Sequence, residues 1–195
     1  MITQTRQWKA VVIGVSAGGF TALHHILPRF SVEFGLPILI VQHRLDVSGN
    51  YMTESLNKKC QLTVKEAEDK EPIQTGYVYI APAGYHLLVE TDYTLSLCSG
   101  KPVNFSRPSI DVLFETAAEA FGNGLIGIIL TGASQDGTQG IRTIKERGGL
   151  TIAQDPLEAE IDLMPQSAIR SGKVDFILLL DEIPKFVMSL FKDEL

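Results

Sequence analysis

The chain has 195 residues, of which 45% are hydrophobic and 21% are charged. This composition is typical of a globular protein with one core, and it excludes a disordered or fibrous chain. The net charge of -6 argues against a nucleic-acid partner, because phosphate backbones are matched by clustered Lys and Arg, and the basic residues here are scattered. We therefore predict a single domain that spans residues 1–195.

The cysteines and the termini set further limits. Cys60 and Cys98 form no CxxC pair, so we expect no disulfide framework, no metal site and no cofactor. The N-terminal segment lacks a signal-peptide layout, and no apolar run approaches the roughly 18 residues of a membrane span. Residues 192–195 spell KDEL, which we interpret as the charged end of a terminal helix, because an address for the secretory pathway has no meaning without entry into it. A soluble, cytoplasmic protein without membrane insertion is expected.

In chain order, short apolar runs alternate with segments of helical periodicity. This alternation predicts a doubly wound, mainly parallel α/β sheet with helices on both faces. Near-continuous Val, Ile and Leu favour strands that are buried on both sides. The expected strands are AVVIGV (10–15), LPILIVQ (36–42), LIGIILT (125–131), LTIAQ (150–154) and VDFILLL (174–180).

Two helices are predicted between the later strands. Residues 109–121 place apolar side chains on one stripe at helical spacing, namely Ile110, Leu113, Phe114, Ala117 and Phe121. Residues 139–149 form a second helix that glycine ends. The middle of the chain differs, since residues 61–98 hold short alternating segments separated by turn residues. We interpret them as a small antiparallel, hairpin-like insertion between the α/β halves.

Three residues that follow predicted strands have side chains suited to catalysis. Ser16 follows AVVIGV, His43 follows LPILIVQ, and Asp136 lies in the loop after LIGIILT. Ligands of open parallel sheets bind beyond the carboxyl ends of the strands. A nucleophile, a base and a carboxylate at one such edge match a Ser-His-Asp triad, in which imidazole accepts the serine proton and the carboxylate orients the imidazole.

The glycines around Ser16 suit the same chemistry. Small neighbours such as Gly18 let a substrate carbonyl approach the serine at a tight turn between strand and helix. The free N–H groups of a helix N-terminus would stabilise the oxyanion. We expect the backbone N–H of Ala17 to be one oxyanion donor and the loop around Ala133 to supply another. The run GVSAG matches the GxSxG elbow, but the order Ser, His, Asp differs from that of α/β-hydrolases, so such a triad would be convergent.

Other interpretations of these residues stay open. Ser16 and Asp136 could each cap the helix that follows, and His43 could be a surface residue at a strand end. GVSAGG could form an anion site, although neither a GxGxxG nor a P-loop pattern is present. His24 and His25 are expected to be surface or partly buried residues of a helix rather than bases at the site, whereas His86 is a rival to His43 or an auxiliary substrate contact.

At these residues the sequence resembles the catalytic domain of the chemotaxis protein-glutamate methylesterases. The resemblance covers nearly the whole chain, through AVVIGVSAGG, VQHR, YIAPAGYH, SRPSIDVLFETAA, GIILTGASQDGTQG, GGLTIAQD and MPQSAI. It implies a serine hydrolase that cleaves glutamate methyl esters on the cytoplasmic helices of chemoreceptors, releases methanol, and in many members also deamidates glutamines. The family nucleophile, base and carboxylate would fall on Ser16, His43 and Asp136.

Two positions depart from the family, which usually has threonine where this chain has Ala17 and methionine where it has Ala133. The receiver domain that chemotaxis members usually carry is also missing from these 195 residues, so control by a separate regulatory protein is expected. These departures keep two alternatives open. One is a non-catalytic module that binds receptor or kinase helices, and the other is an esterase or amidase with a different acyl substrate.

Overall fold

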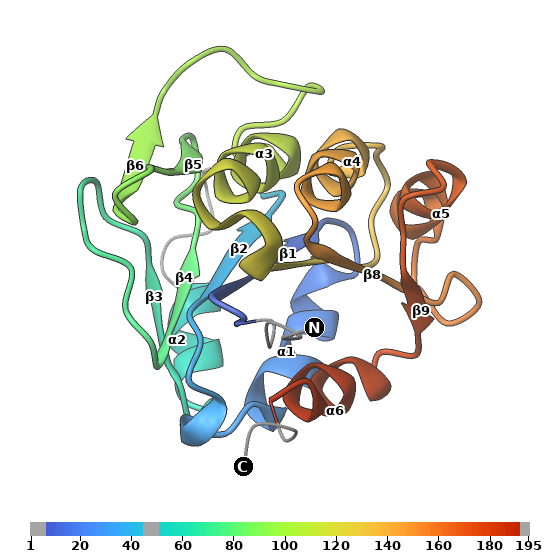
Figure 1. Ribbon diagram of the computed structural model, residues 1–195, viewed down its shortest axis with the longest axis horizontal. Coiled ribbons are helices and arrows are strands. Elements are labelled where there is room, and N and C mark those ends of the chain that lie inside the picture. The colour runs from blue at the N-terminus through green and yellow to red at the C-terminus, as the bar shows by residue number, and fades with distance from the viewer. Residues whose placement is uncertain (1–6, 45–50, 192–195) are drawn as a thin grey trace, which may run out of the picture.

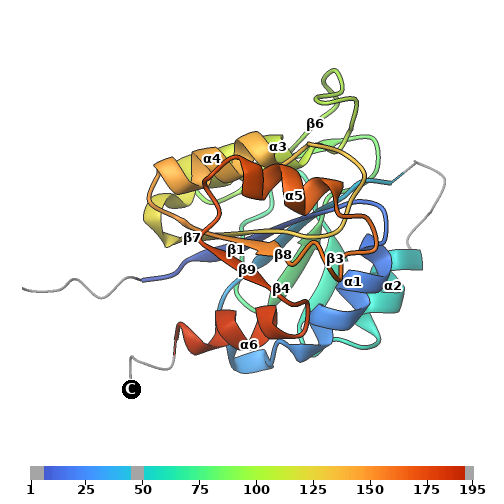
Figure 2. The same ribbon diagram turned by 90° about the vertical axis from the view of Figure 1, so that its right-hand side faces the viewer.

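The computed structural model describes residues 7–44 and 51–191. Within these ranges, seven parallel strands form one twisted sheet in the order β3-β4-β2-β1-β7-β8-β9, with helices on both faces (Figures 1 and 2). The predicted fold class, a doubly wound parallel sheet with a small antiparallel addition, is confirmed. The strands are β1 (Ala10–Val15), β2 (Ile38–Gln42), β3 (Thr63–Glu66), β4 (Tyr77–Ile80), β7 (Leu125–Ile129), β8 (Leu150–Gln154) and β9 (Phe176–Leu178).

The middle third of the chain is only in part the insertion that its sequence suggests. β3 and β4 join the main sheet in parallel, so the prediction that all of 61–98 forms hairpin-like strands is wrong. Only β5 (His86–Val89) and β6 (Leu95–Cys98) make an antiparallel hairpin, which pairs His86 with Cys98. Strands of four residues such as β3 and β4 are too short to show from their own pattern which partner they choose.

The helices divide between the two faces of the sheet, as the edge-on view makes clear (Figure 2). α1 (Gly19–Ile26), α2 (Tyr51–Asn57) and α6 (Glu182–Ser189) cover one face. The other face carries α3 (Ile110–Phe121), α4 (Thr138–Glu146) and α5 (Leu163–Arg170), and the β5–β6 hairpin packs beside α3. Short 3-10 turns occupy Leu27–Arg29, Val32–Phe34 and Gly122–Gly124.

Alternating side chains of the central strands build both cores. In β1, Val11, Ile13 and Val15 face the α1 side, while Ala10 and Val12 face the α3 side. All five are fully buried, as a strand covered on both faces requires. The predicted apolar stripe of residues 109–121 is buried throughout in α3.

The last strand departs from the predicted two-sided burial. β9 lies at the edge of the sheet, and Phe176 and Ile177 remain 39% and 49% exposed. Its apolar run resembles that of a central strand, but with a neighbour on one side only the strand is half covered.

The structure bears on two further predictions, the absence of a membrane span and the interpretation of the KDEL segment. None of the helices in the described ranges has the length and apolar content of a membrane span. The KDEL segment at 192–195, which we interpreted as a helix end, lies outside the described residues, and the final helix, α6, ends at Ser189.

Candidate active site

The strand order brings together the ends of β2, β1 and β7, which are direct neighbours in the sheet. All three run in the same direction, so the residues that follow them emerge at one edge. Ser16 comes directly after β1, His43 directly after β2, and Asp136 in the loop after β7. The three residues that the sequence singled out therefore share a carboxyl edge, which is the ligand-binding edge of open α/β sheets.

Gln42 ties the first two of these residues together. Its side-chain amide donates hydrogen bonds to the carbonyl oxygens of Ser16 (2.8 Å) and His43 (2.9 Å). The backbone N–H of His43 also donates to the carbonyl of Val15 (3.0 Å). Gln42 is only 7% exposed, so the backbones of Ser16 and His43 are held at a set separation by a buried donor.

The His43 ring reaches across β1 to the loop after β7. Its Nε2 lies 2.8 Å from Oδ2 of Asp136, and the His43 and Asp136 side chains are 13% and 0% exposed. A proton on Nε2 serves this hydrogen bond, which leaves Nδ1 as the nitrogen that can accept another proton. Within the described residues Nδ1 has no hydrogen-bond partner, and the Ser16 hydroxyl donates to no acceptor.

Asp136 is held by donors from outside its own loop. Its carboxylate caps the start of α3, whereas the N-cap of the helix that follows Asp136 is Gly137. The interpretation that Asp136 caps the next helix is thus wrong. The five donors to the carboxylate are His43 Nε2 (2.8 Å), Asn104 Nδ2 (3.0 Å), Ser109 Oγ (2.9 Å), Ile110 N (2.6 Å) and Asp111 N (3.2 Å).

These contacts decide the charge of Asp136. Burial raises the pKa of the carboxyl, but hydrogen bonds from His43, Asn104 and the first backbone N–H groups of α3 outweigh it, so the pKa lies below its ordinary value. The positive end of the helix dipole favours the same ionised form. Asp136 is therefore an anion against the imidazole, as an orienting carboxylate must be.

A second buried carboxyl lies beside it. Asp111 is 6% exposed and accepts hydrogen bonds from the Gly140 N–H (2.7 Å) and the Asn104 amide (2.7 Å). Burial, with the charges of Asp136 and Glu115, raises the pKa of Asp111 to about 6. Asn104 joins the two carboxyls, because its one side-chain nitrogen donates to both.

The turn after β1 exposes Ser16 without using it as a helix cap. Gly18, in the left-handed region at φ 77°, is the N-cap of α1, and no side chain caps that helix. The backbone of Ser16 is held instead, since its N–H donates to the Thr131 carbonyl (3.0 Å) and its carbonyl accepts from Gly19 (2.9 Å). The interpretation of Ser16 as an N-cap is therefore wrong.

Backbone N–H groups near Ser16 that lack acceptors among the described residues include those of Ala17 and Ala133. Both residues are exposed. The Ala133 loop lies against Ser16, because a Cβ added to the preceding Gly132 would stand 2.8 Å from the Ser16 Cβ. Free donors on either side of a serine are the requirement for an oxyanion site.

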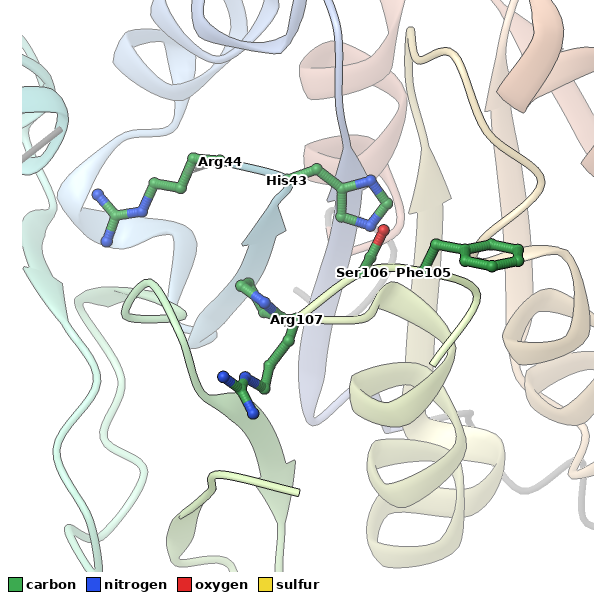
Figure 3. A pocket seen from close by; sticks show the side chains of 6 residues that line it. His43, Arg44, Phe105, Ser106 and Arg107 are labelled. Atoms are coloured by element: carbon green, nitrogen blue, oxygen red, sulfur yellow. The ribbon is translucent and has the colours of Figure 1, made fainter. Parts of the chain in front are cut away.

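A pocket of about 370 Å³ opens beside His43. Figure 3 shows the Ser106 hydroxyl pointing toward the His43 ring, with Arg44 and Arg107 on one side and Phe105 directed the other way. Apart from His43 and Arg44, the lining residues come from the segment that leads into α3, Phe105, Ser106, Arg107 and Pro108. The pocket is large enough to admit a side chain that carries an ester.

The other histidines have different surroundings. His86 is 3% exposed, and its two ring nitrogens contact the Lys101 carbonyl (3.0 Å) and the N–H of Ser109 (3.2 Å). It thus supports the segment that leads into α3, and neither of its ring nitrogens is free. His24 lies near Ser55 (3.2 Å) and His25 pairs with Asp181, in agreement with the expected helix positions.

Sequence reasoning missed several residues around the site. Gln42 stands next to His43, Asn104 lies two residues before the run SRPSID, and Ser109 lies within that run, but no local pattern assigns them a role. Ser109 is completely buried and its hydroxyl donates to Asp136, so it cannot meet a substrate. A polar residue just before a helix was the one available signal, and it suggests a cap rather than a contact with a distant carboxylate.

Comparison with known proteins places the chain in one family. Residues 11–187 match the model described as CheB methylesterase. A relative from Leptospira interrogans, named putative protein-glutamate methylesterase/protein-glutamine glutaminase, is 53% identical over 188 residues, which are 96% of this chain and 97% of the relative. One from Archaeoglobus fulgidus, named protein-glutamate methylesterase/protein-glutamine glutaminase, is 36% identical, and the match covers 95% of this chain but 54% of the relative.

A solved structure agrees with the sequence matches. The crystal structure of the Thermotoga maritima CheB methylesterase catalytic domain superposes with a TM-score of 0.90 at 36% identity, covering 94% of this chain and 99% of the other. Such agreement in fold and sequence, over nearly the full length of both chains, identifies the architecture as that of a catalytic domain. The chain belongs to the CheB methylesterase family.

Proposed function

We propose that this member of the family hydrolyses methyl esters of glutamate side chains in proteins, with Ser16 as nucleophile, His43 as general base and Asp136 as the orienting carboxylate. The observation that carries the proposal is the His43–Asp136 contact of 2.8 Å at the strand end beside Ser16. An ionised, fully buried carboxylate bound to one imidazole nitrogen leaves the other nitrogen basic.

In the first half of the reaction, the Ser16 oxygen attacks the ester carbonyl carbon while its proton passes to Nδ1 of His43. The carbonyl oxygen becomes an oxyanion, which the N–H groups of Ala17 and Ala133 stabilise. Gly18 is left-handed at φ 77°, and the Glu160 side chain fills the space that a Cβ there would take. When the bond to the methoxy oxygen breaks, that oxygen takes the proton from His43 and methanol leaves, so that Ser16 carries the glutamyl acyl group.

In the second half, a water molecule gives a proton to His43 and attacks the acyl carbon. Collapse of this intermediate returns the proton to the Ser16 oxygen and frees a glutamate side chain. In this proposal the hydrogen bond between Ser16 and His43 forms when substrate binds, since catalytic hydrogen bonds of free enzymes are often open.

Deamidation of glutamine is a second candidate activity, which the names of the relatives support. The same acyl intermediate forms from an amide, with ammonia as the leaving group in place of methanol. The site requires no additional group for this reaction, because His43 can protonate either leaving group.

The substrate that we propose is a helix from the cytoplasmic part of a chemoreceptor, and a cytoplasmic location follows from it. Residues 1–195 act in this proposal as a single catalytic domain. No cofactor enters the reaction. The non-catalytic module and the esterase with another substrate remain the alternatives that an assay must separate from it.

Methanol release from a methylated receptor fragment tests the proposal. Replacement Ser16→Ala is expected to lower kcat by about three orders of magnitude or more, because the triad acts as a unit. Ser106→Ala removes the hydroxyl that points toward the His43 ring in Figure 3 and should cost far less. Full activity in Ser16→Ala would overturn the mechanism. Wild-type protein that binds receptor but hydrolyses neither it nor an activated ester would favour the non-catalytic module.

A further inference from the structure

Phe105 is a fully exposed aromatic side chain beside the candidate active site. Its exposed fraction is 103%, and no ring contact involves it in the part of the chain that the structure describes. A single exposed apolar residue is ordinary on a protein surface. Phe105 also lines the same pocket as His43, so it lies where a bound substrate could contact it.

The backbone holds Phe105 in an unfavourable conformation. Asn104 and Phe105 both lie in the left-handed region, with φ of 49° and 62°, at the tip of a turn that Val103 and Ser106 close with two hydrogen bonds (3.1 and 2.8 Å). Asparagine tolerates this region, but for a bulky residue such as phenylalanine it is uncommon. Strained residues of this kind cluster at ligand-binding sites.

The turn is fixed to the catalytic carboxylate. Asn104 donates to Asp136 (3.0 Å) and to Asp111 (2.7 Å), and at its base Arg107 donates to the carbonyls of Ser99 and Gly100 (2.9 and 2.8 Å). Because these anchors hold the tip from two sides, the Phe105 ring is presented at a set distance from His43.

The charges near the Phe105 ring indicate which kind of partner surface the ring contacts. Arg107 is exposed and has no carboxylate within 4 Å among the described residues, whereas Arg44 across the pocket pairs with Glu66. Figure 3 shows the Phe105 ring directed away from both arginines. In a chain of net charge -6, an apolar tip two residues from a cation that pairs with no carboxylate in the described ranges complements a surface with both apolar and acidic residues.

We propose that Phe105 is a specificity-determining contact for the methylated helix itself. Its ring packs on an apolar side chain of that helix, Arg107 faces an acidic side chain, and the turn aligns the ester with Ser16. The inference rests on the proposed function, since the occupant is its substrate. An amphipathic helix offers apolar and acidic residues one turn apart, as this pair requires.

Assays of the full chain with two substrates distinguish an effect on helix docking from an effect on the chemical step. Phe105→Asn removes the ring while keeping a residue that tolerates the left-handed backbone, and Phe105→Leu keeps apolar surface. For a methylated receptor fragment, Phe105→Asn should lower kcat/KM about tenfold, mainly through KM, with Phe105→Leu in between. The rate with p-nitrophenyl acetate, which has no helix to dock, should stay within about twofold.

Val32→Asn is the matched control. Val32 is 63% exposed and precedes β2, so it lies at the opposite end of the sheet and should leave both rates unchanged. An equal fall on both substrates in Phe105→Asn would overturn the proposal, because the turn would then serve the triad alone. Unchanged kcat/KM for the receptor fragment would also overturn it.

Binding distinguishes a failure of this inference from a failure of the proposed function. Affinity for the receptor fragment is measured in the Ser16→Ala background, where no turnover is needed, and Phe105→Asn should weaken it about tenfold. Equal affinity with and without the ring would reject Phe105 as a contact even if wild-type protein releases methanol. A change of sedimentation coefficient in Phe105→Asn would instead assign the ring to a contact between two copies of the chain and reject the proposal.

Discussion

Gln42 illustrates how one buried amide holds together two proposed catalytic residues that lie 27 positions apart in the sequence. Its nitrogen joins the carbonyls of Ser16 and His43, while its oxygen is buried without a partner among the described residues. Half of this amide is therefore unsatisfied, which a residue selected for stability alone would avoid. We infer that Gln42 positions the nucleophile and the base.

Replacement Gln42→Met keeps the volume and removes the two hydrogen bonds. We expect kcat for methanol release to fall about 10- to 100-fold with little change in KM, because the distance between nucleophile and base is no longer set. The free energy of unfolding should change by about 1 kcal/mol or less, since an unpaired oxygen disappears together with the donor. A loss of stability that matches the loss of activity would point to a purely structural role.

Asp111 makes the stability of the protein depend on pH. Its pKa of about 6 lies above the ordinary value near 4, so the folded state binds this proton more tightly than the unfolded state. The contribution of Asp111 to stability thus increases as the pH falls from 7.5 to 5, by about 1 to 2 kcal/mol, because only about one pH unit of this window lies below its pKa. Asp136 has a lowered pKa and stays ionised in this window, losing its contribution only at lower pH.

Urea unfolding at pH 7.5 and pH 5 tests this expectation by comparison with Asp111→Asn. The variant lacks the titrating group, so its stability should gain less on acidification than that of the wild type. The difference between the two proteins is the quantity to measure. Burial lowers the pKa of His24, so His24 reduces the stability of both proteins as the pH falls, which opposes the effect of Asp111. Parallel pH profiles for the two proteins would contradict the assignment.

At the scale of elements, the site depends on how closely α3 and α4 approach. Gly140 in α4 faces Phe114 in α3, and a Cβ at Gly140 would collide with the Phe114 Cβ. The N–H of Gly140 also donates to Asp111, whose own backbone N–H donates to Asp136. The contact between α3 and α4 therefore supports the start of α3, which binds the Asp136 carboxylate.

Gly140→Ala should destabilise the fold by about 1 to 3 kcal/mol, since overpacking outweighs the better helix propensity of alanine. Chemical denaturation measures this loss. Gln139→Ala, at an exposed position of the same helix, is the control and should be neutral within about 0.5 kcal/mol. A Gly140→Ala protein as stable as the control would mean that α3 and α4 separate without cost.

At the scale of the whole molecule, the two cores are joined by the sheet they share. Each central strand contributes side chains to both, so neither face can lose its packing while the other keeps it. We expect residues 1–195 to unfold as one cooperative unit. Fluorescence of Trp8, the single tryptophan, and far-UV circular dichroism should give the same denaturation midpoint, and separate midpoints would reject the single-domain prediction.

Much of this architecture was readable from the order of residues. β1 and β8 match their predicted ranges at both ends, because a continuous apolar run that ends in polar residues is a local signal. The apolar stripe of α3 is equally local. β3 and β4 were assigned to the wrong partners, since four residues of alternating pattern do not specify a sheet neighbour.

The sequence by itself determined the fold class and the three residues that follow strand ends, because periodicity and strand ends lie within short windows. Only the tertiary structure decided that β2, β1 and β7 are neighbours, that Asp136 binds the start of α3, and that Asn104 fixes an exposed Phe105 beside His43. These arrangements join residues separated by 26 to 93 positions. They depend on the packing of the whole core, which no local pattern encodes.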